Sequence, residues 1–328
     1  MQAIVLVGGE GTRLRPLTDT IPKPALTLVD RPFLAYMIEW LAAHGVTEAV
    51  LACGFLPDAL QEALGDGEHA GVRLTYVTEP ERRGTAGAIR FAADALGERL
   101  EDRFLALNGD VLTDLDLGAL MGAHRERQAP ATIALCKVED CSAYGLVGVD
   151  AAGQVLDFTE KAGEPVPGEI NAGAYFLERS VLDLIPPGRE VSIEREVFPR
   201  LIGNGLGALR LDGYWMDIGT PERYLHASWD ILEGRVATMV RPTAPGLFVG
   251  AGAEVAEGAR VGPRAVVSSG CRVAAGAEVR ESVLLDGCGL GEGASVNGSI
   301  LGPGVTVDAE AELAGAIVGR DERVPAQR

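Results

Sequence analysis

A glycine-rich loop directly follows the first apolar run of the chain. Residues 3–7 read AIVLV, and residues 8–18 read GGEGTRLRPLT. An uninterrupted aliphatic run of this kind is typical of a strand buried on both faces. Glycines leave backbone amides uncovered, so that successive N–H groups can converge on an anion. Because Arg13 and Lys23 add positive charge, the segment predicts a loop that binds polyphosphate.

Two common phosphate-binding motifs do not fit this loop. A P-loop ends in Gly-Lys-Ser/Thr and runs directly into a helix, whereas Thr-Arg follows Gly11 and the prolines at 16, 22 and 24 keep the next stretch extended. The dinucleotide pattern needs G-x-G-x-x-G, and Leu14 stands where its third glycine belongs. The remaining alternative is a glycine-rich surface loop with scattered arginines, and the length of the whole segment argues against it.

The loop, together with the P-K-P triplet at residues 22–24, resembles the signature of the sugar-1-phosphate nucleotidylyltransferases. This resemblance implies that an NTP and a sugar 1-phosphate react to give an NDP-sugar and pyrophosphate, with Mg²⁺ as the cofactor. It also implies that Arg13 and Lys23 are catalytic. The residues that it implies for nucleotide binding are Val7, Gly8, Gly9, Gly11, Thr12, Arg13, Glu79, Gly84, Thr85 and Asn108.

The composition narrows the choice of partner and compartment. The 328-residue chain has room for one large domain and a smaller one, and its net charge of −18 argues against nucleic acid or an anionic membrane as a partner. Its five cysteines are scattered and contain no CxxC pair, so neither a disulfide framework nor a zinc site is expected. The first apolar run is too short for a signal peptide and no stretch reaches membrane length, so we expect a cytoplasmic protein.

Strands alternate with helices over the first 130 residues, which predicts an α/β fold with a mostly parallel, Rossmann-like mixed sheet. Such sheets bind ligands beyond the carboxyl ends of their strands. The expected strands span residues 3–7, 48–52, 72–78 and 104–107. The expected helices span residues 33–44, 57–64 and 85–96, the last of them with Thr85 as its N-cap.

Shorter β segments follow from residue 131 and are expected to close the sugar side of the site. A helix is expected over residues 192–201 and another over 221–232. Thr220 should cap the second of these helices, with Pro221 at its first position, so that Asp217 is not used as a cap.

A hexapeptide period begins near residue 245. It predicts a parallel β-helix, and by resemblance a left-handed one, so that residues 1–235 form the catalytic domain and 245–320 the β-helix domain. We expect the repeat to serve assembly or regulation, in a homo-oligomer. The repeated aliphatic residues are Val249, Val255, Val261, Val267, Val273 and Val279, then, after two register slips, Leu284, Leu290, Val296, Leu301, Val307 and Leu313.

Two other classes of protein share parts of this pattern. Hexapeptide acyltransferases use a histidine of the repeat as a base, but the four histidines of this chain all precede residue 245. Regulatory subunits among the relatives lose the catalytic arginine, lysine or aspartates, whereas this chain keeps them. Both alternatives are therefore less favoured than an active enzyme.

The expected reaction joins two anions, because an oxygen of the sugar phosphate attacks the α-phosphorus of the NTP. Charge neutralisation and positioning must supply most of the acceleration, and no general base is needed. Mg²⁺ prefers one or two carboxylates together with phosphate oxygens and water. Asp110 follows a buried strand, Asp217 lies in an apolar segment, and both match the metal-binding aspartates of the family.

The resemblance also implies a sugar-phosphate site. Only three of the 29 basic residues are lysines, which favours a specific use for Lys161 next to Glu160. In the family this Glu-Lys pair faces the sugar and its 1-phosphate. Gly145 and Asn171 match other segments that contact the sugar.

The nucleobase is expected to lie near Glu79. A carboxylate there accepts hydrogen bonds from guanine N1–H and its amino group, and the family's GDP-mannose enzymes carry glutamate at this point. GTP with mannose 1-phosphate is therefore the favoured substrate pair. A glucose-1-phosphate thymidylyl- or uridylyltransferase stays open as an alternative, because the Asn-Gly-Asp sequence at residues 108–110 is closer to that group.

Overall fold

The computed structural model describes residues 1–159 and 165–326. Its contacts divide the chain into two compact units, each described separately below. Unit 1 comprises Met1–Gly9 and Met37–Trp215, and unit 2 comprises Glu10–Tyr36 and Met216–Arg328. The chain therefore passes from unit 1 to unit 2 inside the glycine-rich loop, and a second time within the segment that carries Asp217.

Unit 1 is built on a mixed sheet, ten strands of which lie in the described part of the chain. Its centre is parallel: β1 pairs with β4 on one side and with β7 on the other, and β4 pairs with β6. Beyond β7 the long β12 runs antiparallel. The strands are β1 (Gln2–Val7), β4 (Glu48–Cys53), β5 (Glu68–His69), β6 (Val72–Thr78), β7 (Arg103–Asn108), β9 (Ala131–Val138), β10 (Leu146–Val149), β11 (Val155–Thr159), β12 (Gly168–Glu178) and β13 (Leu206–Arg210).

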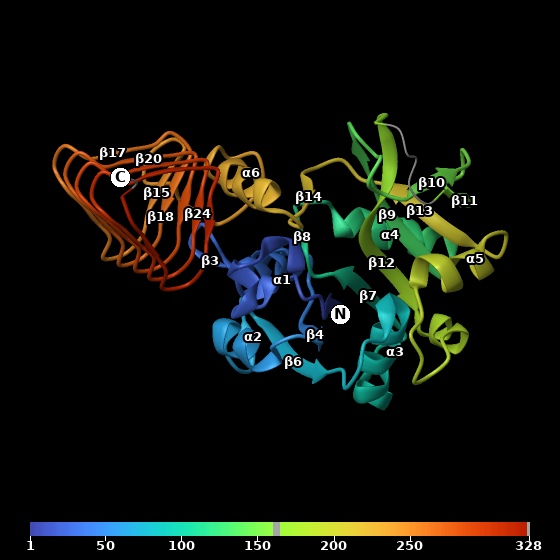
Figure 1. The fold of residues 1–328 in the computed structure, drawn as a ribbon. Coiled ribbons are helices and arrows are strands. Elements are labelled where there is room, and N and C mark those ends of the chain that lie inside the picture. Colours follow the sequence, from blue (N-terminus) through green and yellow to red (C-terminus); the bar gives the residue numbers. More distant parts are fainter. Residues whose placement is uncertain (160–164, 327–328) are drawn as a thin grey trace. The chain divides into compact units, whose positions relative to one another are not determined.

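The central position of β1 explains its sequence. Parallel neighbours occupy both of its edges, and Ala3, Ile4 and Val5 are completely buried. Only an apolar side chain at each of these positions avoids burying an unpaired polar group. The prediction of a Rossmann-like mixed sheet is confirmed (Figure 1).

Helices cover this sheet. α3 packs on it through a small-residue face that includes Ala86, Ala92 and Ala93, in one core cluster with Ile4 and Phe104. α4 was not predicted from the sequence, although Asp116 caps it by accepting a hydrogen bond from Ala119 N. The helices that lie in unit 1 are α2 (Pro57–Leu64), α3 (Gly84–Leu96), α4 (Leu117–Arg127) and α5 (Phe198–Leu201), while α1 (Phe33–Ala43) begins in unit 2 and ends in unit 1.

Unit 2 begins with short turns and ends in a repetitive stack of strands. α6 (Pro221–Leu232) is tied to the first of these parts, because the Tyr224 hydroxyl donates a hydrogen bond to Thr27 O. The elements of the first part are η1 (Thr12–Leu14), η2 (Leu17–Asp19), η3 (Lys23–Ala25), β2 (Thr27–Leu28) and β3 (Arg31–Pro32).

Residues 247–324, which we call the repeat coil, form three parallel sheets. Successive strands belong to the three sheets in rotation, so each sheet takes every third strand. From Val267 onward the aliphatic residues of the hexapeptide period, such as Leu284, form a core inside the coil, whereas Val255 near its start is exposed because no earlier coil covers it. The strands are β15 (Leu247–Val249), β16 (Glu254–Val255), β17 (Arg260–Val261), β18 (Ala265–Val267), β19 (Arg272–Val273), β20 (Glu278–Arg280), β21 (Val283–Leu284), β22 (Gly289–Leu290), β23 (Ser295–Asn297), β24 (Ile300–Leu301), β25 (Thr306–Val307), β26 (Glu312–Ala314), β27 (Ile317–Val318) and β28 (Arg323–Val324).

The sheet formed by β15, β18, β21, β24 and β27 also carries apolar side chains on its outer surface. Neighbouring residues of a strand point to opposite faces, so the residue before each inward aliphatic points outward. Val266, Val283 and Ile300 occupy such positions and are nevertheless buried. We call this set the outer ladder, and its members are Phe248, Val266, Val283, Ile300 and Ile317.

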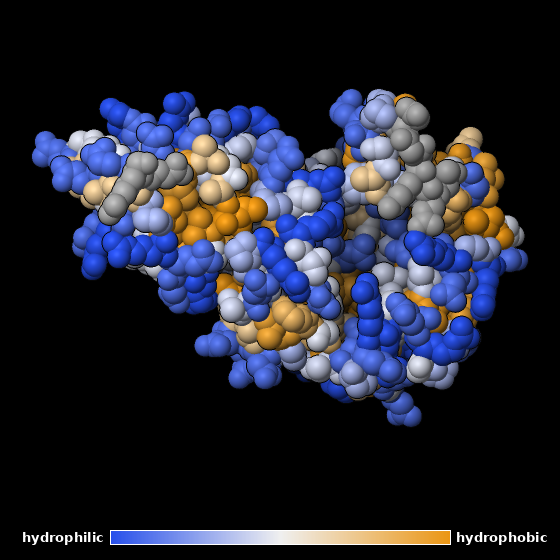
Figure 2. Space-filling view, in the orientation of Figure 1, coloured by the Kyte–Doolittle hydropathy of each residue, from blue (hydrophilic) through white to orange (hydrophobic). Residues whose placement is uncertain are grey.

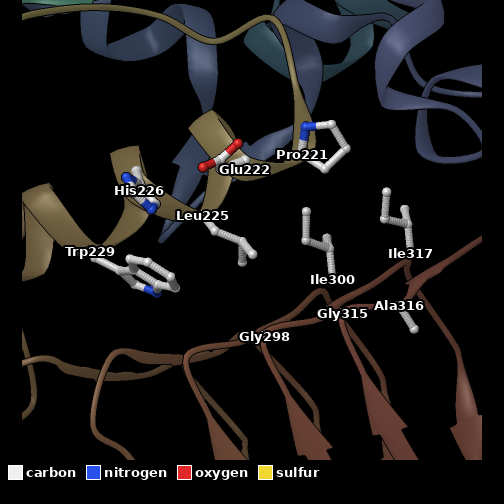
Figure 3. Close-up of a pocket in the computed structure, with 10 residues that line it drawn as sticks. All are labelled: Pro221, Glu222, Leu225, His226, Trp229, Gly298, Ile300, Gly315, Ala316 and Ile317. Atoms are coloured by element: carbon white, nitrogen blue, oxygen red, sulfur yellow. The ribbon is translucent and has the colours of Figure 1, made fainter.

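α6 lies over the outer ladder. A cavity of about 260 Å³ is lined by Leu225 and Trp229 of the helix and by Ile300 and Ile317 of the coil (Figure 3). Figure 2 shows hydrophobic surface on the coil beside α6. Near the end of the helix, Arg264 Nε donates to Glu233 Oε1 at 2.7 Å, and its guanidinium stands 5.2 Å from the Trp229 ring centre. The outer ladder thus anchors α6 to the repeat coil.

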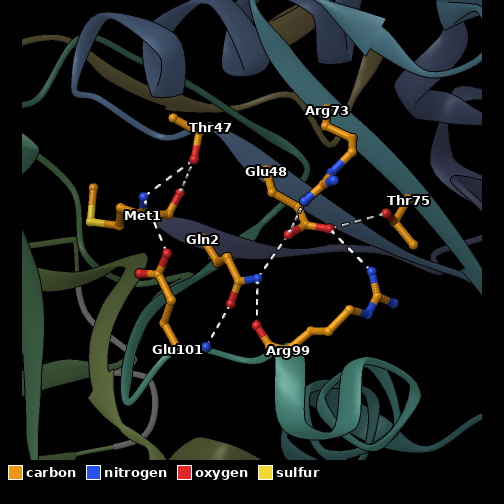
Figure 4. Close-up of polar contacts among 8 residues, drawn as sticks. All are labelled: Met1, Gln2, Thr47, Glu48, Arg73, Thr75, Arg99 and Glu101. Carbon is orange, nitrogen blue, oxygen red and sulfur yellow. Dashed lines mark hydrogen bonds and ion pairs between the residues drawn. The ribbon is translucent and has the colours of Figure 1, made fainter.

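A buried carboxylate joins the amino ends of the central strands of unit 1. Glu48, the first residue of β4, accepts hydrogen bonds from Gln2 Nε2 at 2.8 Å and from Arg73 Nη2 at 2.9 Å (Figure 4). Burial raises the pKa of Glu48, but the Gln2 hydrogen bond, the Arg73 hydrogen bond and the charges of Arg73 and Arg99 outweigh it, and the net pKa is lowered. The folded protein therefore favours the ionised form.

In the part of the chain that the structure describes, none of the helices combines the length and apolar character that crossing a membrane requires.

Glu48→Gln should destabilise the protein by about 1–3 kcal/mol, because it removes the charge from a buried and fully engaged hydrogen-bond acceptor. A lowered folded-state pKa contributes stability above the unfolded pKa, and this contribution is lost as pH falls through the folded pKa. The variant's deficit in unfolding free energy should therefore be largest near neutral pH and should shrink in acid. Urea unfolding at several pH values measures it, with the exposed Glu62→Gln as control; a deficit that does not change with pH would contradict the account.

Candidate active site

The glycine-rich loop leaves β1 at Val7 and enters a tight turn at Gly11. Gly11 has a φ of 63°, a left-handed conformation that a residue with a side chain rarely adopts. Its carbonyl accepts hydrogen bonds from Leu14 N and Thr18 Oγ1, both at 2.9 Å. Leu14 is buried, whereas Thr12 and Arg13 are exposed. The buried Leu14 and the hydrogen bonds to Gly11 O therefore hold the turn in place, and they leave Arg13 exposed at the surface of unit 2.

Lys23 is brought to the same loop. It lies between Pro22 and Pro24 at the start of η3, and only 8% of it is exposed. A methyl group built on Gly11 would lie 3.1 Å from Lys23 Cβ, so the lysine stem packs directly against the turn. Unit 2 thus groups the two basic residues that were predicted to be catalytic with the glycine turn that was predicted to bind phosphate.

Asp217 and Gly219 complete this group. Thr220 caps α6 by accepting a hydrogen bond from Arg223 N at 3.3 Å, and Pro221 takes the first helical position, as the sequence predicted. A methyl group on Gly219 would lie 2.5 Å from Arg13 Nη2 and 3.3 Å from Asp217 Oδ2. A side chain at this position would displace the end of Arg13, because the guanidinium passes directly over this backbone.

Sequence reasoning missed a further partner of Asp217. Arg223 Nη1 forms a hydrogen-bonded ion pair with Asp217 Oδ1. Arg223 is the third residue of α6, where a positive charge opposes the helix dipole. This unfavourable placement could have indicated, from the sequence alone, that Arg223 pairs with an acidic residue outside the helix.

Glu79 lies in unit 1, close to the other half of the glycine-rich loop. A methyl group on Gly8 would stand 3.5 Å from Glu79 Oε1, and Glu79 N donates to Cys53 O at 2.8 Å. Burial raises the pKa of Glu79, against the opposing hydrogen bond and charge of Arg83. Unit 1 therefore places a half-buried carboxylate beside Gly8.

The Gly84–Thr85 segment differs from the sequence prediction in one respect. α3 begins at Gly84, and the residue before the helix is Arg83, which makes no side-chain cap. The Thr85 hydroxyl instead accepts from Ile193 N at 2.8 Å and donates to Glu194 Oε2 at 3.1 Å. The predicted N-cap at Thr85 is wrong, because its hydroxyl is used to hold a distant segment.

A polar network joins the segments predicted for nucleotide and sugar. Asn171 Nδ2 donates to the Tyr175 hydroxyl at 2.9 Å, and that hydroxyl donates to Glu194 Oε1 at 3.1 Å. Glu194 also accepts from Thr85. Tyr175 is completely buried, and burial raises its pKa well above the usual value. Tyr175 and Glu194 were not predicted, and the acidic SIERE run at 192–196 was the signal for the second.

Asn108 and Asp110 lie at the carboxyl end of β7, where the sequence placed them. Gly109 N donates to Leu6 O at 2.9 Å, which holds this turn against β1. A methyl group on Gly173 would lie 2.7 Å from Asn108 Nδ2, so the loop after Asn171 reaches Asn108. Unit 1 therefore brings the Asn108 and Asn171 segments together.

Gly145 lies near Asn171, because Asn171 N approaches Gly145 O at 3.5 Å. Trp215 braces this region: its ring packs edge-on against Tyr144, and its Nε1 donates to Ala172 O at 2.8 Å. Glu160 and Lys161, the other predicted sugar-site residues, lie outside the described residues.

The candidate metal ligands are two carboxylates. In residues 1–159 and 165–326 there is no cluster of three or more His, Cys, Asp or Glu side chains that could hold a metal by itself. Carboxylate oxygens are hard ligands of the kind that bind divalent cations such as Mg²⁺. Asp110 in unit 1 and Asp217 in unit 2 both supply hard oxygen ligands of the required kind.

Comparison with known proteins identifies the family. The model of the nucleotidyl transferase family matches residues 2–234, and that of the GMPPB C-terminal domain matches residues 243–327. The chain belongs to the nucleotidyl transferase family. Members of this family generally use a divalent metal.

The curated relatives of this nucleotidyl transferase include several mannose-1-phosphate guanylyltransferases. It is 40% identical to a mannose-1-phosphate guanylyltransferase of Mycobacterium tuberculosis, over 87% of this chain and 78% of the relative. It is 37% identical to a probable mannose-1-phosphate guanylyltransferase 3 of rice, over 87% of this chain and 80% of the relative. The crystal structure of HddC from Yersinia pseudotuberculosis complexed with GMP-PN superposes with a TM-score of 0.61 at 27% identity, covering 70% of this chain and 99% of HddC.

Gly219→Ala should lower kcat/KM by about tenfold to a hundredfold, because the added methyl group displaces the Arg13 guanidinium. The clash is with the flexible end of a side chain, so the melting temperature should fall little. Pyrophosphate release and thermal unfolding measure the two effects. Gly122→Ala is the matched control, since a methyl group there meets nothing within 4 Å; equal activity in the two variants would show that Arg13 does not depend on Gly219.

Proposed function

We propose that this nucleotidyl transferase makes GDP-mannose and pyrophosphate from GTP and mannose 1-phosphate. A phosphate oxygen of the sugar forms a bond to the α-phosphorus of GTP, and the bond from that phosphorus to the oxygen of the departing pyrophosphate breaks. The observation that carries the proposal is the similarity to mannose-1-phosphate guanylyltransferases over 87% of the chain. HddC, which was crystallised with GMP-PN, adds support for a guanine nucleotide.

The phosphate groups of GTP would be held by the glycine-rich loop. Backbone amides at Gly8, Gly9 and Gly11 and the exposed Thr12 are available to phosphate oxygens. Arg13 lies on a turn that the hydrogen bonds to Gly11 O hold in place. Positive charge that is already in place where negative charge develops lowers the barrier without later reorganisation. We therefore assign Arg13 and Lys23 to neutralising the triphosphate and the departing pyrophosphate.

Asp110 and Asp217 are the residues that would hold Mg²⁺. When bound, the ion supplies charge neutralisation for the phosphates of two anionic substrates. The chain's own contribution is to orient the two carboxylates: Gly109 N and β7 fix the first, and the start of α6 fixes the second.

Glu79 would read guanine. Guanine offers two neighbouring donors, N1–H and the amino group, and one ionised carboxylate accepts from both. A base without that pair of donors leaves the half-buried carboxylate partly unsatisfied, at a cost of about 1–3 kcal/mol. Asn108, Gly84 and Thr85 remain predicted nucleotide contacts, the last of them through its backbone.

The sugar phosphate would bind at Gly145 and Asn171, with Glu160 and Lys161 as the further predicted contacts. Asn171 already donates to Tyr175 and accepts from Gly173 N. Its side chain is therefore fixed before any ligand arrives, which lowers the entropic cost of binding.

Several broader assignments belong to the same proposal. Residues 1–235 would form the catalytic domain and 245–320 a left-handed parallel β-helix. The rotation of strands among three parallel sheets supports the β-helix, and its hand is what the family resemblance implies. The regular outer surfaces of such a helix suit self-association into a homo-oligomer. All five cysteines carry free thiols, which fits the reducing cytoplasm.

An assay of GTP, ATP, UTP and dTTP against mannose, glucose and N-acetylglucosamine 1-phosphates, read by pyrophosphate release, tests the assignment. GTP with mannose 1-phosphate should give the highest kcat/KM. Glu79→Gln should shift the preference toward pyrimidine nucleotides by about tenfold to a hundredfold. The exposed neighbour Glu81 provides the control variant, Glu81→Gln, which should keep the original ranking.

The pH dependence gives a second readout of the same assignment. Guanine recognition requires the Glu79 carboxylate to be ionised, and burial raises its pKa. The KM for GTP should therefore rise as pH falls, at a higher pH than an exposed glutamate would produce, and Glu79→Gln should remove this rise. A wild-type enzyme that prefers dTTP or UTP, with Glu79→Gln leaving that ranking unchanged, would contradict the guanylyl assignment and favour the glucose-type reaction.

A further inference from the structure

Arg223 is an unusual neighbour for a carboxylate that should accept a divalent metal. Its Nη1 pairs with Asp217 Oδ1, and the two side chains are only 31% and 19% exposed. A partly buried ion pair is screened less by solvent and salt than one on the open surface. Any cation that approaches Asp217 therefore meets a carboxylate whose charge is already partly balanced.

The guanidinium is held there by Asp217 rather than by its helix. Arg223 lies in the first turn of α6, where the helix dipole disfavours positive charge. Its backbone N–H is used by the Thr220 cap, which fixes the start of the side chain within reach of Asp217. The ion pair offsets the unfavourable position in the helix.

A second arginine approaches the same turn. Asp217 Oδ2 and Arg13 Nη2 both lie close to the point where a Gly219 side chain would begin, at 3.3 and 2.5 Å. The Asp217 carboxylate thus has the Arg223 guanidinium as an ion-pair partner and the Arg13 guanidinium nearby. Both guanidinium groups repel a divalent cation that approaches this carboxylate.

We propose that Arg223 is a positioning residue that keeps free divalent metal off Asp217 until a nucleotide arrives. The nucleotide brings phosphate charge that balances Arg13 and Arg223, so the metal then binds without this repulsion. The enzyme would accordingly take up its metal together with the nucleotide rather than before it. This inference rests on the proposed role of Asp217 as a metal ligand.

Binding of Mn²⁺ to the nucleotide-free protein, followed by electron paramagnetic resonance, tests the inference without turnover. Arg223→Ala and Arg223→Gln should each bind Mn²⁺ about three- to tenfold more tightly than the wild type, because one repelling charge has been removed. Arg223→Lys keeps that charge and should bind as the wild type does. A merely structural role of Arg223 would have the opposite sign, since a disordered Asp217 binds metal less well.

Two further variants separate the possible failures. Arg272→Ala changes the net charge by the same unit on an exposed part of the repeat coil and should leave Mn²⁺ affinity unchanged. Asp217→Asn should weaken Mn²⁺ binding at least tenfold. If Asp217→Asn weakens binding but Arg223→Ala and Arg223→Gln do not tighten it, the inference about Arg223 is wrong and the metal assignment stands. If Asp217→Asn has no effect, the metal assignment and the inference fall together.

Discussion

The packing of α6 on the outer ladder of the repeat coil determines how the polar residues of unit 2 are held. The helix presents Leu225 and Trp229 to Ile300 and Ile317, and the Tyr224 hydroxyl binds the segment that follows the glycine-rich loop. Asp217 lies four residues before the helix, and the Thr220 cap fixes the turn between them. A change in the seating of α6 would therefore reach the candidate metal ligand directly. The repeat coil, for which assembly or regulation stays a prediction, holds α6 and through it the turn that carries Asp217.

The pKa values of two carboxylates in unit 1 are shifted in opposite directions. Glu48 is surrounded by donors, so its pKa is lowered and its charge joins three strands. Glu79 has few donors and its pKa is raised by burial, which leaves it able to accept hydrogen bonds from a ligand. The two carboxylates thus differ in the donors around them, and this difference gives their pKa values opposite directions.

Local patterns predicted most of the fold. The apolar run at residues 3–7 became the central β1, and the valine period became the core of the repeat coil. Both predictions succeeded because the burial pattern can be read from the sequence. A strand buried on both faces needs consecutive apolar residues, and the coil needs an aliphatic residue at every sixth position. The outer ladder was missed although it too has a period, one extra aliphatic in every third hexapeptide, as at Val266 and Val283.

The site was predicted less completely, because several of its contacts join residues far apart in the chain. The glycine-rich loop, Lys23 and Asp217 could be found from motifs. The Thr85 hydroxyl bonds residues more than a hundred positions away, so its local sequence looked like a helix cap. Tyr175 was not predicted as a site residue, because its polar role depends on Asn171 and Glu194.

Hydrogen exchange of Leu225→Ala tests most directly whether the glycine-rich loop, α6 and the repeat coil form one cooperative body. Leu225 is buried against the outer ladder, and its truncation should cost about 2–4 kcal/mol. The account predicts that amides in residues 12–32, in α6 and in the repeat coil lose this opening free energy together, while those of β1, β4 and β7 keep theirs. Loss of protection confined to α6, with residues 12–32 unchanged, would contradict it.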